Sequence, residues 1–190
     1  MDKNFNLIIT GVGGQGIITL VSVLAQACLE QGYDVKSSEL HGLSQRGGSV
    51  IIHIRFGKKV YSPLVARDEA DLLISLELTE GLRHADFGNK DAKFLINNHY
   101  IAFEGSLAKE ETTQKLKEIA GENLYLVPAS KICKEKLDKE VLAGMYILGH
   151  ACCKNLMPLN PESVLSSIDS VIPENYKEIN IKAFNLANDN

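Results

Sequence analysis

The feature that most constrains this fold is a glycine-rich turn, Gly-Val-Gly-Gly-Gln-Gly at 11–16, between an apolar run at 7–10 and an apolar-rich stretch at 17–27. That order predicts a strand, a tight turn and a helix. Glycines let backbone N–H groups approach an anion, and the helix start adds free N–H groups and a positive dipole end. The alternative, that the glycines serve only a sharp turn and close helix–sheet packing, stays open on spacing alone. The predicted phosphate-cradling residues are Gly11, Gly13, Gly14, Gln15 and Gly16.

The remaining chain alternates strand-like and helix-like segments. This alternation predicts one Rossmann-like, three-layer α/β/α domain over residues 1–190 with a mostly parallel sheet. Strands are predicted at 6–10, 34–38, 49–56, 70–76, 93–97 and 124–127. Helices are predicted at 17–30, 77–84, 112–120, 130–137, 141–154, 161–171 and 176–186, with Ser130 as a helix cap and Pro161 at the first position of its helix.

One strand is expected to introduce an antiparallel pairing. After the strand at 49–56, Gly57 and Lys58 predict a turn, and 59–62 is expected to return as the second strand of a β-hairpin. The sheet should therefore be mixed. His53 and Arg55 share one face of this hairpin, and we expect that face to be solvated.

A second polar, glycine-rich segment occupies 39–48 and is predicted to be a loop. It follows the second strand, as the first glycine turn follows the first strand. Because ligands bind where parallel strands end, we expect the two glycine segments to be neighbours.

Several side chains of this second segment are candidates for ligand contact. Glu39, 23 residues after Gly16, lies near the offset of a ribose-binding carboxylate, with a surface role as the alternative. The Arg46 guanidinium suits a phosphate or carboxylate, or it pins its own loop. No residue is assigned a catalytic role, and His41 and Arg46 are the candidates for an assisting one. The predicted binding set here is Glu39, Ser44, Gln45, Arg46, Gly47 and Gly48.

Composition excludes several other classes of function. A net charge of -4 gives no general reason to bind nucleic acid, and no apolar stretch is long enough to span a bilayer. Residues 1–4 lack the layout of a signal peptide, so a cytoplasmic location is expected. His150 lies in an apolar run and is expected to be a satisfied core or interface residue. The four cysteines form no CxxC pair and predict reduced, structural thiols without a metal: Cys28, Cys133, Cys152 and Cys153.

Together, the segments at 11–17 and 39–50 resemble the gamma-type subunit of the 2-oxoacid:ferredoxin oxidoreductases. The second segment is most similar to the indolepyruvate oxidoreductase beta subunit, which is the same domain under another name. Further similarity at 60–64, 70–73 with Glu77, and 181–184 extends over almost the whole chain. The Gln-Arg-Gly-Gly-Ser sequence at 45–49 is far more specific than the glycine fingerprint. One departure is that Leu142, Ala143, Gly144 and Met145 stand where the family is expected to have an Asn, which puts that residue's polar contact in doubt.

The resemblance implies a division of labour. Enzymes of this family decarboxylate a 2-oxoacid with thiamine diphosphate, pass two electrons through iron–sulfur clusters to ferredoxin, and transfer the acyl group to coenzyme A. This chain would be a non-cluster subunit, inactive alone, acting on indolepyruvate, pyruvate or another oxoacid in anaerobic metabolism. Thiamine diphosphate, magnesium and the clusters would belong to partner subunits, and the isolated chain could form a homodimer. The residues alone leave two alternatives open, a stand-alone dinucleotide-binding oxidoreductase and a regulatory ligand-binding module.

Overall fold

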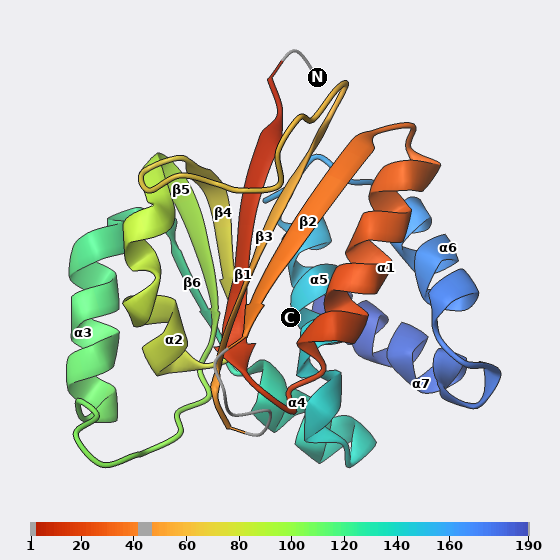
Figure 1. Cartoon of the computed structure of the whole chain (residues 1–190). Helices are drawn as coiled ribbons and strands as arrows, with labels where there is room; N and C mark the ends of the chain where they lie inside the picture. The colour runs from red at the N-terminus through yellow and green to blue at the C-terminus, as the bar shows by residue number, and fades with distance from the viewer. Residues whose placement is uncertain (1–2, 42–46, 190) are drawn as a thin grey trace.

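A six-stranded sheet lies between two layers of helices (Figure 1). The structure, a computed structural model, describes residues 3–41 and 47–189. The strand order is β2-β3-β1-β4-β5-β6, and β3 pairs antiparallel with both β1 and β2, while β1/β4, β4/β5 and β5/β6 are parallel. The predicted three-layer fold with a mixed, mostly parallel sheet is therefore confirmed. The strands are β1 (Phe5–Val12), β2 (Asp34–His41), β3 (Ser49–Gly57), β4 (Ala70–Ser75), β5 (Gly88–Asn97) and β6 (Leu124–Val127).

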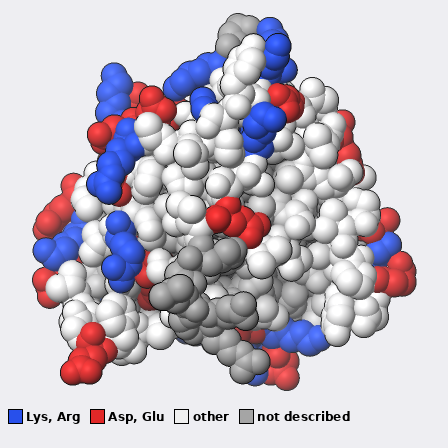
Figure 2. All heavy atoms as spheres, in the orientation of Figure 1, with Lys and Arg blue, Asp and Glu red and all other residues white. Residues whose placement is uncertain are grey.

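The two helical layers are unequal. Helices α2 and α3 cover one face of the sheet, and the other five cover the opposite face (Figure 1). Within the described ranges, no helix is long and apolar enough to cross a membrane. On the face shown in Figure 2, the charged side chains lie mainly toward the margins. The helices are α1 (Ile17–Glu30), α2 (Leu78–Arg83), α3 (Lys109–Ala120), α4 (Ala129–Leu137), α5 (Ala143–Cys153), α6 (Pro161–Val171) and α7 (Glu174–Asn185), with 3-10 turns η1 (Ala85–Phe87), η2 (Gly121–Asn123), η3 (Glu140–Leu142) and η4 (Leu186–Asp189).

Strand alternation distributes the apolar side chains between two cores. In β1, Leu7 and Ile9 pack into the larger core with α1 and α5, whereas Ile8 packs into the smaller core with α2 and α3. Strands covered on both faces need such a continuous apolar run. On the larger side, Gly144 brings α5 close to α1, because an added Cβ would lie 3.1 Å from Leu20 Cδ1. The glycine that stands in the region of the expected Asn thus serves helix packing.

The predicted β-hairpin with 59–62 is wrong. The antiparallel neighbours of β3 are β1 and β2, with Asp34 opposite Gly57 and His41 opposite Val50. The chain after β3 is held by a side chain instead of a strand ladder, since Val60 N donates to Asp34 Oδ2 at 2.8 Å. Strand β2 also extends to His41, so the predicted loop at 39–48 begins too early.

The expectation that His53 and Arg55 are solvated is also wrong. His53 is buried, and its Nδ1 accepts a hydrogen bond from Val65 N at 3.2 Å. Burial lowers the pKa of His53 below its ordinary value. Arg55 donates through Nε to Asn6 Oδ1 at 2.9 Å and through Nη1 to the Ser62 carbonyl at 3.3 Å. His53 therefore binds the segment that follows β3, and Arg55 links that segment to β1.

The structure corrects the expectation for His150 and shows where the thiols lie. None of the four cysteines, all within the described residues, is in a disulfide, and burial raises the pKa of Cys28 and Cys152 to about 12 and that of Cys133 to about 11. These three thiols are therefore poor nucleophiles. His150 is buried as expected, but its Nδ1 has no hydrogen-bond partner among the described residues.

Candidate functional site

The carboxyl ends of β1, β4, β5 and β6 meet at one edge of the sheet, which holds a cavity of about 370 Å³. Ligands bind at this edge in open α/β sheets. The cavity is lined by Val12, Gly13, Gly14, Gln15, Gly47, Leu76, Asn97, His99, Ile101, Ser130, Glu140, Val141 and Ala143.

The first glycine segment forms the turn that the sequence predicts. Gly14 (φ 103°) and Gly16 (φ 75°) adopt left-handed backbone conformations that favour glycine. A Cβ added to Gly11 would lie 2.6 Å from Gln15 Oε1, so a larger residue at this position would displace the Gln15 amide. The α1 N-terminus that follows has no side-chain cap and no acidic residue in its first turn. Its first N–H groups lack intrahelical partners and provide a positive end next to the cavity.

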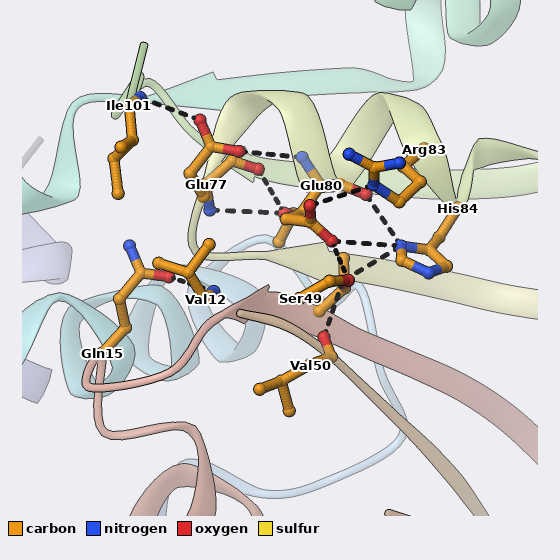
Figure 3. Close-up of polar contacts among 11 residues, drawn as sticks. Val12, Gln15, Ser49, Val50, Glu77, Glu80, Arg83, His84 and Ile101 are labelled. Carbon is orange, nitrogen blue, oxygen red and sulfur yellow. Dashed lines mark hydrogen bonds and ion pairs between the residues drawn. The ribbon is translucent and has the colours of Figure 1, made fainter. Parts of the chain in front are cut away.

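Gln15 braces the turn from within. Its Oε1 accepts a hydrogen bond from Val12 N at 2.9 Å (Figure 3). Its Nε2 donates to the Leu76 carbonyl at 3.1 Å. Both ends of the side-chain amide are thus engaged by the protein. Gln15 lines the cavity, but its main effect is to fix the end of β1 against the end of β4.

The two glycine segments are neighbours, as predicted. Gly13 N donates to the Gly48 carbonyl at 2.9 Å, and Gly47 N donates to the Gly13 carbonyl at 3.3 Å. Gly47 has a positive φ of 71°. The predicted residues Ser44, Gln45 and Arg46 lie outside the described residues, as does the side chain of His41.

Glu39 does not lie beside the glycine turn. It stands opposite Ile52 in β2, and β3 separates β2 from β1. Its side chain is exposed at the outermost strand of the sheet. This strand order gives the ribose-binding interpretation no geometric support, because that interpretation needs the acidic residue near the glycine turn.

Asn97 and Ser130 form a polar floor that the sequence interpretation missed. Asn97 Oδ1 accepts from Ser130 N at 3.2 Å, and Asn97 Nδ2 donates to Ser130 Oγ at 2.8 Å and to the Leu76 carbonyl at 3.0 Å. Ser130 therefore lies inside the first turn of α4 and does not cap it, and the prediction of Ser130 as the cap is wrong. Asn97, at the end of β5, takes that role across the fold, where local sequence gives no signal for it.

His99 and Glu140 form one wall of the cavity. His99 Nδ1 lies 3.1 Å from Glu140 Oε1, which joins the segment after β5 to η3. The His99 carbonyl also accepts from Leu78 N at 2.8 Å, which ties the wall to α2. The two residues are far apart in sequence, so no spacing pattern could have paired them.

The described side chains do not fit an iron–sulfur cluster or a metal-bound diphosphate. In the parts of the chain that the structure describes, no group of three or more His, Cys, Asp or Glu residues could hold a metal ion. Three of the four thiols, those of Cys28, Cys133 and Cys152, are buried in the larger core. The edge instead offers backbone N–H groups, an amide floor and one histidine–carboxylate pair.

A glycine turn of this kind, braced against a second glycine segment on a mixed sheet between two helical layers, is typical of the Rossmann-like α/β class. Residues 6–189 match the pyruvate ferredoxin/flavodoxin oxidoreductase family, and the chain belongs to that family. The resemblance seen in the sequence is thereby confirmed.

Two relatives and one solved structure show in more detail what the chain is similar to. The chain is 34% identical over 191 residues to the indolepyruvate oxidoreductase subunit IorB of Thermococcus kodakarensis, covering 97% of this chain and 94% of the relative. It is 31% identical over 181 residues to the pyruvate/ketoisovalerate oxidoreductases common subunit gamma of the same organism, covering 91% and 89%. A 2-oxoglutarate:ferredoxin oxidoreductase from Magnetococcus marinus, solved with 2-oxoglutarate, coenzyme A and succinyl-CoA bound, shares the fold with a TM-score of 0.74 at 18% identity, covering all of this chain and 31% of that one. The chain is thus a subunit of a 2-oxoacid:ferredoxin oxidoreductase.

Proposed function

We propose that this chain is the non-cluster subunit of a thiamine diphosphate-dependent enzyme that oxidatively decarboxylates an aryl 2-oxoacid of the indolepyruvate type to its acyl-CoA. The full-length similarity to an indolepyruvate oxidoreductase subunit supports the substrate class. Thiamine diphosphate, magnesium and the iron–sulfur clusters belong to a partner subunit, which passes the electrons to ferredoxin. The lack of fit between the described side chains and either group supports this division.

In this proposal the glycine edge completes an active site whose cofactors the partner holds. The observation that carries it is the pairing of Gly13 with Gly47 and Gly48 beside an open cavity. The Gly13 and Gly47 N–H groups are used in this pairing, which fixes the turn. The uncapped N–H groups at the start of α1 are then the ones that can bind an anionic group of a cofactor or substrate. Ser44, Gln45 and Arg46 remain proposed contacts of this edge, with Arg46 as the main cation and His41 as an assisting residue. Glu39 is left out of the proposal, because β3 separates its strand from β1.

The first experiment is co-expression of the tagged chain with the neighbouring reading frame. We expect a co-purifying chain that contains thiamine diphosphate and iron, and indolepyruvate-dependent, coenzyme A-dependent reduction of ferredoxin, with slower turnover of pyruvate. A chain that stays alone contradicts the proposal. Tight binding of a dinucleotide by the isolated chain would favour a stand-alone oxidoreductase, and light scattering of the isolated chain tests the expected homodimer.

The second experiment tests Arg46. We expect Arg46→Ala to lower the turnover of the assembled enzyme by about tenfold or more while the thermal midpoint is unchanged, because a charged contact to an anion is lost. The matched control is Arg67→Ala, which removes an exposed partner of Asp86 away from the glycine edge. Normal turnover in the Arg46 variant excludes the role of that residue.

A further inference from the structure

Helix α2 lies on the smaller helical layer, yet the carboxylates of its N-cap, Glu77, and of Glu80 in its first turn contact residues at or next to the candidate site, namely Ile101 and Ser49 (Figure 3). Glu77, the residue that caps α2, is 2% exposed, and Glu80 in its first turn is 4% exposed. Burying a carboxylate costs free energy unless hydrogen bonds and charges compensate it. Their partners therefore show what these two buried groups hold in place.

Glu80 holds the start of β3. Its carboxylate accepts hydrogen bonds from the Ser49 hydroxyl and, at 3.0 Å, from Arg83 Nε. Ser49 follows Gly48 directly and pairs in register with Val12 of β1. Glu80 thus contacts the residue that follows Gly48, and the Gly48 carbonyl accepts the hydrogen bond from Gly13 N.

Thr10 and His84 form a second path between α2 and the same strand ends. Thr10 Oγ1 donates to the Val50 carbonyl at 2.9 Å and lies 3.2 Å from His84 Nδ1. Because the single hydroxyl hydrogen of Thr10 points to Val50, His84 Nδ1 must be the donor in the second contact. The same nitrogen lies 3.1 Å from the Glu80 carbonyl oxygen, which can only accept. The ends of β1 and β3 are therefore cross-linked to α2 immediately before and after the two glycine segments.

Glu77 holds the opposite wall of the cavity. Its Oε2 accepts from Glu80 N at 2.8 Å, which caps α2, and its Oε1 accepts from Ile101 N at 3.1 Å. A shorter side chain such as Ser or Asp is sufficient for an N-cap. The longer glutamate reaches beyond the helix to the segment that carries His99 and Ile101, both of which line the cavity.

We propose that Glu80 and Glu77 are positioning residues for the enzyme's reaction: Glu80, through Ser49, fixes the Gly47–Gly48 backbone against Gly13, and Glu77 fixes the His99–Ile101 wall. Neither carboxylate lines the cavity, so both act through the backbone that does. The expected effect on turnover rests on the proposed function. The expected effect on the backbone geometry does not, because it can be tested on the chain alone.

Amide hydrogen exchange of the full chain tests the geometric part. We expect Ser49→Ala and Glu80→Ala to accelerate exchange at the Gly13 and Gly47 amides by about tenfold or more, with the β6 amides unchanged. Both variants lack the hydrogen bond between Ser49 and Glu80, so local opening of this backbone costs less free energy. Glu80→Gln should restore slow exchange, since its carbonyl can accept from Arg83 while its NH2 donates to Ser49 Oγ. Thr79→Val, on the same helix but without a link to either glycine segment, and Glu118→Ala, on the surface of α3, are the controls.

Two exchange results overturn the proposal. Unchanged protection at Gly13 and Gly47 in Ser49→Ala shows that Glu80 does not position the glycine backbone. Acceleration that is uniform over the sheet shows that the network has only a general structural role. If Glu80→Ala fails to fold, Ser49→Ala and Glu80→Gln still test the proposal, because both variants keep an acceptor for Arg83.

Turnover of the assembled complex tests the functional part. We expect Ser49→Ala to lower kcat/KM by about tenfold at unchanged subunit content, and Thr79→Val to leave it unchanged. Wild-type kcat/KM in a Ser49 variant with accelerated exchange at Gly13 overturns the positioning role. Failure of the wild-type chain to assemble contradicts the proposed function instead, and the exchange result then stands by itself.

Discussion

The two helical layers stabilise the sheet by different means. The larger layer buries a mostly apolar core, in which side chains such as Leu20, Leu24 and Tyr146 are shielded from water. Its buried polar side chains, which include His150, Ser167 and Asn180, are not carboxylates. The smaller layer combines a modest apolar core with buried polar groups, including Glu77, Glu80 and Thr10.

The difference indicates that the larger layer mainly sets the global stability of the fold, whereas the smaller layer also positions the candidate site. Apolar burial is non-directional and scales with area, so the larger layer can stabilise the fold without fixing any one loop. Hydrogen bonds to buried carboxylates are directional, and on the smaller layer they end on Ser49 and Ile101 at the candidate site. Substitutions on the larger layer should therefore change global stability, and substitutions among the polar groups of the smaller layer should also change the site.

The largest expected effect comes from a matched pair of leucines. Leu24 of α1 and Leu116 of α3 are both fully buried, one in each core. We expect each change to alanine to lower the free energy of unfolding by about 2–5 kcal/mol, with Leu24→Ala at the upper end because α1 is enclosed by more neighbours and can relax less. Urea denaturation measures both. A larger loss for Leu116→Ala would break the assignment of stability to the larger layer.

A smaller but more local effect is expected at Glu77. Glu77→Ala leaves Glu80 N and Ile101 N without their acceptor, and we expect a loss of about 1–3 kcal/mol in urea denaturation. Glu77→Gln keeps an acceptor for one of the two amides and should lose less. Nuclear magnetic resonance shifts should move at 99–101 in both variants. Shifts confined to α2 would show that Glu77 is only a helix cap.

Local patterns were sufficient for the elements and insufficient for the site. The α1 bounds, the glycine turn and the alternating strands follow from period and turn chemistry, which act over a few residues. The pairing of β3 with β1 joins strands that are distant in sequence, and β2 pairs with the other side of β3. Local sequence does not indicate this arrangement, so the prediction that 59–62 pairs with β3 is wrong. Asn97 with Ser130, and His99 with Glu140, meet only after folding, and neither pair has a sequence spacing that marks it.

The buried histidines allow a finer test, since there is one on each layer. His53 Nδ1 has a donor in Val65 N, whereas His150 Nδ1 has no partner among the described residues. At pH 7 we expect His53→Leu to cost about 1–2 kcal/mol, because a buried N–H loses its acceptor, and His150→Leu to be neutral or stabilising. Equal losses in both variants would show that Nδ1 of His150 is hydrogen-bonded in solution.

The same pair predicts a dependence on pH. Burial lowers the pKa of both imidazoles in the folded chain, and for His150 nearby Lys154 lowers it further. The unfolded chain takes up protons near the ordinary pKa of about 6.5, so stability is present above that pH and is lost as the pH falls toward the lowered pKa values of the folded chain. A double His53→Leu, His150→Leu variant should show a flatter dependence of the urea midpoint between pH 7 and pH 5. A midpoint that falls as steeply as in the wild type would assign the acid sensitivity to other groups.

The smallest expected effect has the opposite sign. Thr79 Oγ1 is buried in α2 without a hydrogen-bond partner among the described residues. Valine has nearly the same shape and removes the unsatisfied hydroxyl, so we expect Thr79→Val to raise the free energy of unfolding by up to about 1 kcal/mol. Thermal and urea unfolding measure this gain, and Gly13 amide exchange should stay at the wild-type rate when corrected for global stability. A gain in stability without any change in exchange at Gly13 would show that global stability and the geometry of the glycine backbone can be changed separately within one helix. A loss of stability would show that the hydroxyl is hydrogen-bonded in solution and belongs to the polar network of the smaller layer.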